Sequence, residues 1–221
     1  MLSKPYIVKP CTEDVKILFT DDDLLLVNKP AGLLSVPGRH PANKDCLVTR
    51  VQRQYADARI VHRLDMDTSG IMVLALSADS HRALSQLFAE RKIIKEYEAN
   101  VYGTVIDDHQ LIDLPLLCDW PNRPRQKVDF HHGKNAQTWV ERVSQHQDGW
   151  TRVLLKPVTG RSHQLRVHLA EIGHPILGCE FYAHQRAVSM ANRLQLHATK
   201  LEFCHPNSGE TILGSSNCPF Q

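Results

Sequence analysis

The chain has 221 residues, a formal net charge of +2 and six cysteines. This length is enough for one substantial hydrophobic core, so we expect a single domain over residues 1–221, with 1–16 as an extended segment. The net charge is too small for the whole molecule to bind polyanions by charge alone, and the cysteines form no C-x-x-C pair. No stretch has the length of a signal-peptide core or a membrane span, which predicts a cytoplasmic protein with no membrane partner.

The first half of the chain predicts strands followed by a helix. Apolar runs at 16–20 and 24–29 are joined by three aspartates, which is typical of two strands and a turn. The apolar run 71–76 predicts a strand that is buried on both faces. A helix should follow it, because Ser77 is a good N-cap and leucines recur at helical spacing after it.

The second half predicts further strands and one more helix. Apolar and polar residues alternate from 96 to 103, which predicts a strand with Tyr97 on its less polar face. A strand is expected at 151–155, a helix at 162–172 and a closing strand at 194–203. Because strands outnumber helices and do not alternate with them regularly, the pattern favours an α+β fold with a largely antiparallel sheet.

One motif indicates chemistry rather than packing. The run His62-Arg63-Leu64-Asp65-Met66-Asp67-Thr68-Ser69-Gly70 places a carboxylate beside an arginine and a glycine-ended turn, directly before the apolar run 71–76. An ionised side chain that leaves water is costly unless it is paired or used chemically, so we expect an active site around Asp65. The string H-R-L-D-x-x-T-S-G resembles the active-site signature of the pseudouridine synthases, in the RluA family.

Four more elements of this family occur in the family's order, and the resemblance extends from about residue 17 to 206. They are Asn28-Lys29-Pro30-Ala31-Gly32-Leu33, Lys95-Glu96-Tyr97, Gly160-Arg161-Ser162-His163-Gln164-Leu165-Arg166-Val167-His168 and Leu194-Gln195-Leu196-His197-Ala198. Segments 35–39 and 119–124 are closest to short dual-specificity members, which modify 23S ribosomal RNA and a tRNA anticodon loop. The tail after Glu210 resembles the family's ending only loosely.

The resemblance implies a pseudouridine synthase fold, with a mostly antiparallel central sheet, peripheral helices and a catalytic cleft that binds RNA. It implies the isomerisation of particular uridines to pseudouridine in 23S rRNA and tRNA stem-loops, without a cofactor or a metal. Many relatives carry an S4 RNA-binding domain before the catalytic one, whereas the few residues before Ile17 are too short for one. We therefore expect no S4 domain, and a monomer that recognises RNA through its catalytic domain.

The resemblance also assigns three catalytic residues. Asp65 is the nucleophile, or it assists elimination as a general base; the sequence leaves both routes open. Arg166 is its partner, because a facing guanidinium favours the ionised carboxylate. Helical geometry places Arg166 about 100° from Leu165, at the edge of the buried stripe, where it reaches a cleft. Tyr97 stacks on the flipped uracil, or is a core tyrosine.

A stacked base cannot reach a half-buried carboxylate, so the target uridine must flip out. The resemblance gives Arg63 the task of displacing it; the alternative is a phosphate contact. A basic, proline-broken segment near residue 120 suits an RNA loop, although a solvated loop would look the same. The residues expected at RNA are His62, Arg63, Trp120, Arg123, Arg125, Lys127 and Arg161.

Other readings are open at this point. His163, His168 and His197 invite a metal site, but they lack a known ligand spacing and fit hydrogen-bonded packing better. The run 67–70 is similar to an aspartic protease loop, which works with a second copy that this chain lacks. A noncatalytic RNA-binding protein or RNA chaperone would keep the basic segments and not require Asp65.

Overall fold

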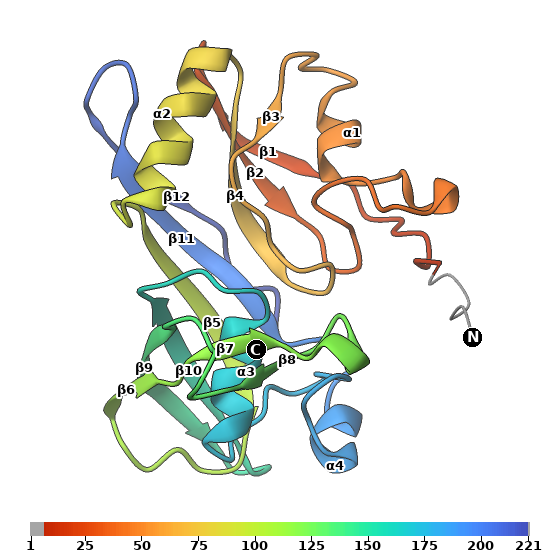
Figure 1. Ribbon diagram of the computed structural model, residues 1–221, viewed down its shortest axis with the longest axis vertical. Helices are drawn as coiled ribbons and strands as arrows, with labels where there is room; N and C mark the ends of the chain where they lie inside the picture. The colour runs from red at the N-terminus through yellow and green to blue at the C-terminus, as the bar shows by residue number, and fades with distance from the viewer. Residues whose placement is uncertain (1–6, 221) are drawn as a thin grey trace. The chain divides into compact units, whose positions relative to one another are not determined.

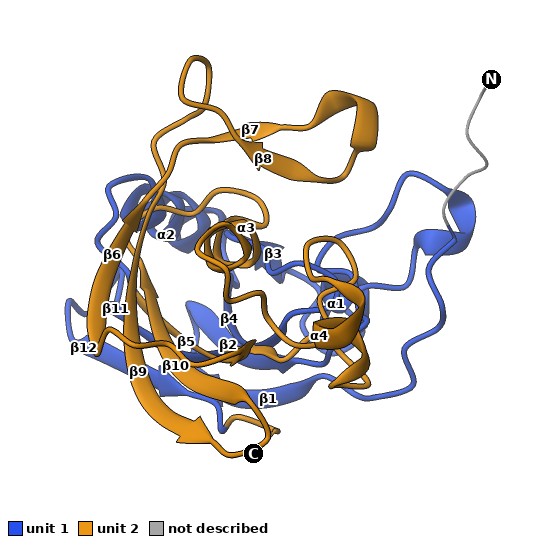
Figure 2. Ribbon diagram, turned by 90° about the horizontal axis from the view of Figure 1, so that it is seen from below, with its two compact units in different colours: residues 1–94, 198–217 blue, residues 95–197, 218–221 orange. Residues whose placement is uncertain are grey.

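The computed structural model describes residues 7–220 (Figure 1). They fall into two compact units, coloured separately in Figure 2. Unit 1 contains residues 7–94 and 198–217, and unit 2 contains residues 95–197 and 218–220. The single domain expected over the whole chain stays a prediction.

The extended segment expected at 1–16 lies partly outside the described residues. From residue 7 to 15 the chain forms neither helix nor strand, and β1 begins at Lys16. The backbone N–H of Val8 donates to the side-chain oxygen of Asn43 at 2.9 Å. This contact attaches the described part of the segment to unit 1.

Unit 1 is built on a sheet in the order β1-β2-β4-β11, with β3 paired to β4 and β12 paired to β11. The strands are β1 (Lys16–Thr20), β2 (Leu24–Lys29), β3 (Arg59–Ile60), β4 (Ser69–Ala75), β11 (Leu196–Cys204, in unit 1 from residue 198) and β12 (Thr211–Ser215). The β1–β2, β2–β4, β3–β4 and β11–β12 pairings are antiparallel. The Asp21 carboxylate accepts the N–H groups of Asp23 and Leu24 at 2.8 Å and so closes the predicted β1–β2 turn.

Strand β4 is the buried centre of unit 1, as the sequence predicts. All seven of its residues are buried, and α2 (Ala78–Ala89) lies against it (Figure 1). The Ser77 hydroxyl accepts the N–H of Ser80 at 3.0 Å, which confirms the predicted N-cap. A Cβ added to Gly214 of β12 would lie 2.7 Å from the Cδ1 atoms of Ile71 and Leu26, so the ends of these two side chains would have to shift. Two short helices complete the unit: η1 (Pro41–Asn43) and α1 (Leu47–Val51).

Unit 2 contains a sheet in the order β5-β10-β9-β6, and its pairings are antiparallel. Its strands are β5 (Ile94–Tyr102, in unit 2 from residue 95), β6 (His109–Asp113), β9 (Gln137–His146) and β10 (Trp150–Pro157). Ala99 and Val101 of β5 are fully buried, and Tyr97 packs against the same core. The predicted inward orientation of Tyr97 is therefore confirmed. The antiparallel strand pairings, together with the few helices, confirm the predicted α+β class.

Helix α3 (Gln164–Glu171) lies between the sheet of unit 2 and a small hairpin (Figure 2). Leu165 and Leu169 face the core of the sheet, whereas Val167 packs with Leu116 on the hairpin side. The hairpin consists of β7 (Leu116–Cys118), η2 (Trp120–Asn122) and β8 (Gln126–Val128). A last helix, α4 (Gln185–Ser189), follows. Helix α3 starts two residues later than predicted, because His163 has a left-handed φ of 55°.

The divergent C-terminal tail ends against unit 2. Phe220 is only 9% exposed, and its carbonyl accepts a hydrogen bond from Arg152 at 2.7 Å. The guanidinium carbons of Arg152 and Arg193 lie 5.7 and 5.8 Å from the centre of its ring. The last described residues are thus part of the folded unit.

Candidate active site

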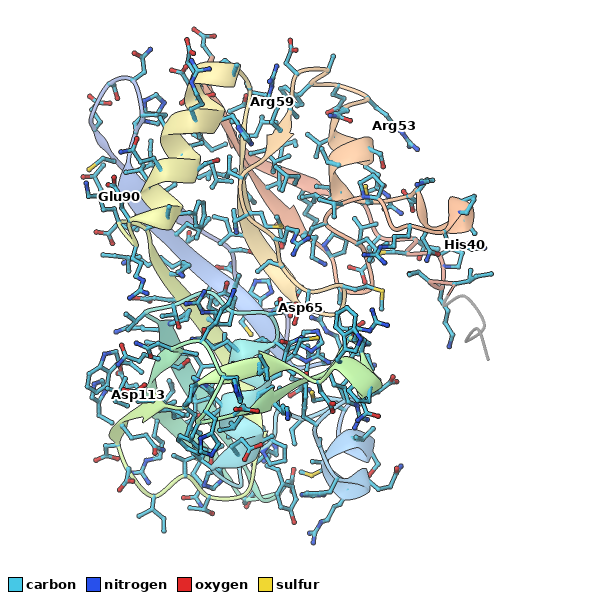
Figure 3. All side chains as sticks on the ribbon, viewed as in Figure 1. His40, Arg53, Arg59, Asp65, Glu90 and Asp113 are labelled. Carbon is cyan, nitrogen blue, oxygen red and sulfur yellow. The ribbon has the colours of Figure 1, made fainter. Side chains whose placement is uncertain are left out.

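Asp65 lies on the loop that connects β3 to β4 (Figure 3). Its side chain is half-buried, and Arg63, two residues earlier, is exposed. The N–H of Thr68 donates to the Asp65 carbonyl at 3.2 Å, which forms a turn directly before the strand. The Asp65 side chain therefore lies just before the first residue of β4, a strand whose residues are all buried.

A buried lysine binds the backbone of the Asp65 loop. Lys29 at the end of β2 is 0% exposed, and its ammonium donates to the carbonyls of Pro30, Leu33 and Met66 at 2.8, 2.7 and 2.9 Å. The N–H of Gly32 donates to the same Met66 carbonyl at 2.9 Å. Since a buried ammonium is costly without such partners, these bonds fix two loops to each other.

Ser35 makes a second clamp on the same loop. Its hydroxyl donates to the Leu64 carbonyl at 2.7 Å and accepts the Leu64 N–H at 3.2 Å. Ser35 is 4% exposed, and Leu64 is 8% exposed. The residue just before Asp65 is thus held at both of its backbone polar groups, in a place where water cannot replace them.

His62 supports the start of the loop. Its Nε2 accepts the N–H of Val73 in β4 at 3.1 Å, and its ring stacks on Phe88 of α2 with centroids 4.5 Å apart. These contacts give His62 a supporting role in unit 1. The RNA contact predicted for it stays a prediction, as does the base-displacing role of Arg63.

The second group of candidate residues lies in unit 2, where α3 carries Arg166. Contrary to the expected place at the edge of the buried stripe, Arg166 is only 2% exposed. Its Nε donates to the sulfur of Cys179 at 3.4 Å, and its guanidinium carbon lies 5.1 and 5.6 Å from the ring centres of Phe181 and Tyr182. The segment that contains these three residues covers the helix and buries the charge, which the helical pattern alone does not reveal.

Two neighbours of Arg166 anchor α3 to β9. Gln164 donates through its Nε2 to the carbonyl of Gln137 at 2.9 Å and to the Thr138 hydroxyl at 3.0 Å. His168 Nε2 lies 3.0 Å from the Leu114 carbonyl, and its Nδ1 lies 3.0 Å from the Thr138 hydroxyl. Because a carbonyl only accepts, Nε2 carries the proton and Nδ1 accepts the hydroxyl hydrogen.

Burial controls the charge of His168. The side chain is 0% exposed, and desolvation lowers its pKa below the ordinary value of 6.5. The imidazole is therefore neutral near pH 7, in keeping with its two hydrogen bonds. The packing role predicted for His168 is confirmed, and His197 is likewise buried, at 1% exposure.

Tyr97 is a half-buried residue of β5, paired with Leu155 of β10. It belongs to unit 2 together with Arg166, whereas Asp65 belongs to unit 1. The catalytic roles of these three residues, and the pairing of Asp65 with Arg166, stay predictions.

The hairpin β7–β8 carries four of the seven residues expected at RNA: Trp120, Arg123, Arg125 and Lys127. Trp120 is 67% exposed, and the guanidinium of Arg123 lies 3.9 Å above its ring while Arg123 Nε donates to the Trp120 carbonyl at 3.2 Å. Arg125 lies 5.9 Å from the ring of Phe181, and Lys127 forms an ion pair with Asp129 at 3.3 Å. The tip of the hairpin therefore presents one aromatic ring and exposed cations.

Arg161 lies just before α3 and outside the hairpin. It is exposed, and its Nε donates to the Asn135 carbonyl at 3.1 Å. Nowhere among residues 7–220 do three or more His, Cys, Asp or Glu side chains gather closely enough to hold a metal ion. In the same part of the chain, no helix is both long and apolar enough to cross a membrane.

Sequence reasoning missed several residues that shape these two regions. They are Lys29, Ser35, Gln164, Cys179, Phe181 and Tyr182. Lys29 and Gln164 stand inside recognised family elements, so the signal was present, but their partners are backbone and hydroxyl groups far along the chain.

Comparison with known proteins supports the family suggested by the motifs. Residues 23–171 match the family model described as RNA pseudouridylate synthase. The dual-specificity RNA pseudouridine synthase RluA of Yersinia pestis is 56% identical over 193 residues, which covers 87% of this chain and 94% of the relative. The protein of the same name from Escherichia coli K12 is 54% identical over 196 residues, which covers 89% and 90% of the two chains.

Solved structures agree with these matches. The human RNA pseudouridylate synthase domain containing 1 superposes with a TM-score of 0.80 at 27% identity and covers 96% of this chain and 87% of its own. The Asp65 loop and α3, which carries Arg166, both lie within residues 23–171, which match the family model.

Proposed function

Because this chain belongs to the RNA pseudouridylate synthase family, we propose that it isomerises particular uridines in loops of 23S ribosomal RNA and of a tRNA anticodon stem. The relatives named dual-specificity RNA pseudouridine synthase are 54–56% identical to this chain over the aligned residues. The observation that carries the proposal is the Asp65 loop. It presents a half-buried carboxylate on a backbone that Lys29 and Ser35 hold in place.

The reaction rearranges bonds without adding or removing atoms overall. The bond from ribose C1′ to uracil N1 breaks, the base turns, and C1′ joins C5; the C5 proton leaves while N1 gains one. Asp65 serves this sequence as a nucleophile or as a general base, and the structure is compatible with either route. One ionised carboxylate suffices for both, so the proposal needs no metal and no cofactor.

Arg166 and Tyr97 complete the proposed machinery. Arg166 pairs with the Asp65 carboxylate, since a planar guanidinium is suited to bidentate hydrogen bonds to a carboxylate. The Nε of Arg166 donates to the sulfur of Cys179. Tyr97 stacks on the flipped uracil from its place on β5.

RNA reaches this machinery by base flipping. The exposed side chain of Arg63 fills the space that the uridine leaves, at a cost of a few kcal/mol for unstacking. Trp120 stacks on a loop base, and the cations of the same hairpin, together with Arg161, neutralise phosphates. We place this activity in the cytoplasm and assign it to a monomer that acts on structured RNA.

Tritium release tests the proposal. Two transcripts, a 23S rRNA hairpin and a tRNA anticodon stem-loop, carry uridine labelled with tritium at C5. The wild-type protein should release tritium from both, and Asp65→Asn should lower the rate by about 10³-fold or more. Asp67→Asn is the matched control and should stay within a few-fold of wild type.

The outcomes separate the alternatives. If wild type binds the transcripts and releases no tritium, the chain is a noncatalytic RNA-binding protein or chaperone, and the proposal is wrong. Release from only one transcript would exclude dual specificity. Equal release by Asp65→Asn and wild type would exclude Asp65 as the catalytic carboxylate.

A further inference from the structure

Tyr182 contacts three parts of unit 2 that have separate tasks. Its hydroxyl oxygen lies 2.9 Å from the backbone nitrogen of Gln126 in the hairpin and 2.6 Å from Nδ1 of His163 at the start of α3. Its ring lies 5.6 Å from the guanidinium carbon of Arg166. One side chain therefore touches the hairpin, the start of the helix and the arginine.

One of these two hydrogen bonds has a fixed direction. The N–H of Gln126 can only donate, so the Tyr182 oxygen accepts it. The direction of the bond between the Tyr182 hydroxyl and Nδ1 of His163 is set by the histidine tautomer. In either direction, the same oxygen binds both elements and fixes the distance between them.

Phe181 adds an aromatic link of the same kind. Its ring stacks on His163 with centroids 5.7 Å apart, and the guanidinium carbons of Arg166 and Arg125 lie 5.1 and 5.9 Å from its centre. Arg125 belongs to the hairpin and Arg166 to α3. Because a cation is attracted to an aromatic ring, the ring of Phe181 interacts with both arginines.

His163 is linked to Arg166 through the start of α3. It is the N-cap of α3, has a left-handed backbone with φ of 55°, and precedes Arg166 by three residues. A non-glycine residue holds that conformation only when its surroundings impose it. Here the Tyr182 hydroxyl and the Phe181 ring are among those surroundings.

We propose that Tyr182 is a positioning residue, which couples the hold of the β7–β8 hairpin on RNA to the orientation of Arg166. This inference rests on the proposed function, in which the hairpin binds RNA and Arg166 faces the catalytic carboxylate. RNA that binds the hairpin fixes the position of the hairpin. Tyr182, which binds both the hairpin and His163, then fixes the position of His163 and of α3, and this orients the guanidinium of Arg166 toward the catalytic carboxylate. The coupling makes catalysis depend on a correctly held loop.

A double-mutant cycle measures the coupling. In the wild-type background, Trp120→Ala should raise KM and also lower kcat by about tenfold, within the roughly 5–150-fold range of coupled sites. Tyr182→Phe removes the hydroxyl and keeps the ring, and should lower kcat to a similar degree. In the Tyr182→Phe background, Trp120→Ala should still raise KM but leave kcat nearly unchanged.

Independent contributions would give a different result. If the two changes lower kcat by factors that multiply, Tyr182 carries no coupling and the inference is overturned. Tyr102→Phe is the matched control, since it removes a hydroxyl elsewhere in unit 2, and its kcat should be that of wild type. If Tyr182→Phe does not fold, Phe181→Leu takes its place in the cycle with the same expected pattern.

A spectroscopic measurement reads the link directly. Nitrogen NMR of labelled histidine should show an Nδ1 signal of His163 that moves when a transcript is added and that changes in Tyr182→Phe. An Nδ1 signal that is the same in both proteins, with and without RNA, would contradict the inference. A wild-type protein without tritium release would instead contradict the proposed function, so the two failures are distinguishable.

Discussion

The Asp65 loop and the tip of the β7–β8 hairpin are built in opposite ways. The loop is held by side chains with little or no exposure, such as Lys29 and Ser35, which bind its backbone atoms. The hairpin tip instead exposes 67% of Trp120 and places the guanidinium of Arg123 over its ring. A group that performs chemistry must be fixed to a fraction of an ångström, whereas a surface that holds RNA needs accessible rings and charges.

We expect changes to the buried side chains that hold the loop to reduce stability and catalysis together, whereas changes at the hairpin tip should weaken RNA binding and leave stability almost unchanged. The largest effect should come from Lys29→Met. This change keeps most of the volume but removes the donor from two buried carbonyls and one half-buried carbonyl, so the free energy of unfolding should fall by about 2–3 kcal/mol. Chemical denaturation measures it.

Lys16→Met is the control for that experiment, because Lys16 is exposed on β1. Its unfolding free energy should lie within about 0.5 kcal/mol of wild type. Equal stabilities for the two variants would show that the buried lysine does not hold the loop.

Ser35→Ala should have the next largest effect. The Leu64 N–H and carbonyl lose their partner in a buried place, which should cost about 1–2 kcal/mol of unfolding free energy. Because Asp65 follows directly, kcat should fall about tenfold while KM changes little. Steady-state tritium release measures both constants. Ser144→Ala, at an exposed position of β9, is the control variant. A rise in KM at constant kcat would assign Ser35 to RNA binding instead.

Trp120→Ala should leave the fold almost untouched. Its exposed ring contributes less than about 0.5 kcal/mol to unfolding, but RNA affinity should fall by about 1–3 kcal/mol, the value of one stacked base. Fluorescence anisotropy with a labelled stem-loop measures the affinity. Trp139→Ala, on β9 beside His109, is the control and should bind RNA like wild type. If both variants bind equally well, the hairpin tip is not the RNA contact.

The smallest effect concerns acid. Burial lowers the pKa of His168 in the folded protein, so near pH 6.5 the unfolded chain takes up a proton that the folded one does not. The stabilisation is fully present above pH 6.5 and is lost as the pH falls toward the lower folded pKa. Unfolding curves should show a flatter pH dependence in His168→Asn than in wild type. His131→Asn, at an exposed position, should keep the wild-type slope; identical slopes in all three would refute the assignment.

Features that depend on local pattern could be predicted from the sequence. The burial of β4 follows from an unbroken apolar run, the Ser77 cap from its place before a helix, and the orientation of Tyr97 from alternation along one strand. Each of these signals lies within about ten residues.

Features that depend on distant backbone atoms could not. The Lys29 ammonium binds a carbonyl 37 residues away, and Ser35 binds Leu64 29 residues away, and a carbonyl leaves no trace in the amino-acid sequence. The expected place of Arg166 at the edge of the buried stripe was wrong, because the pattern of α3 contains no information on Phe181, a residue of a later segment whose ring centre lies 5.1 Å from the guanidinium carbon. Tertiary contacts decided all three.

The clamps on the Asp65 loop bind main-chain atoms, and this has a practical consequence for labelling. Lys29 holds the carbonyl of Met66 whatever side chain stands at that position. A reporter such as a fluorinated or cyanylated side chain, placed at Met66, therefore leaves the clamp intact. It would lie one residue from Asp65, the proposed catalytic residue, and record the arrival of a nucleotide without replacing that side chain.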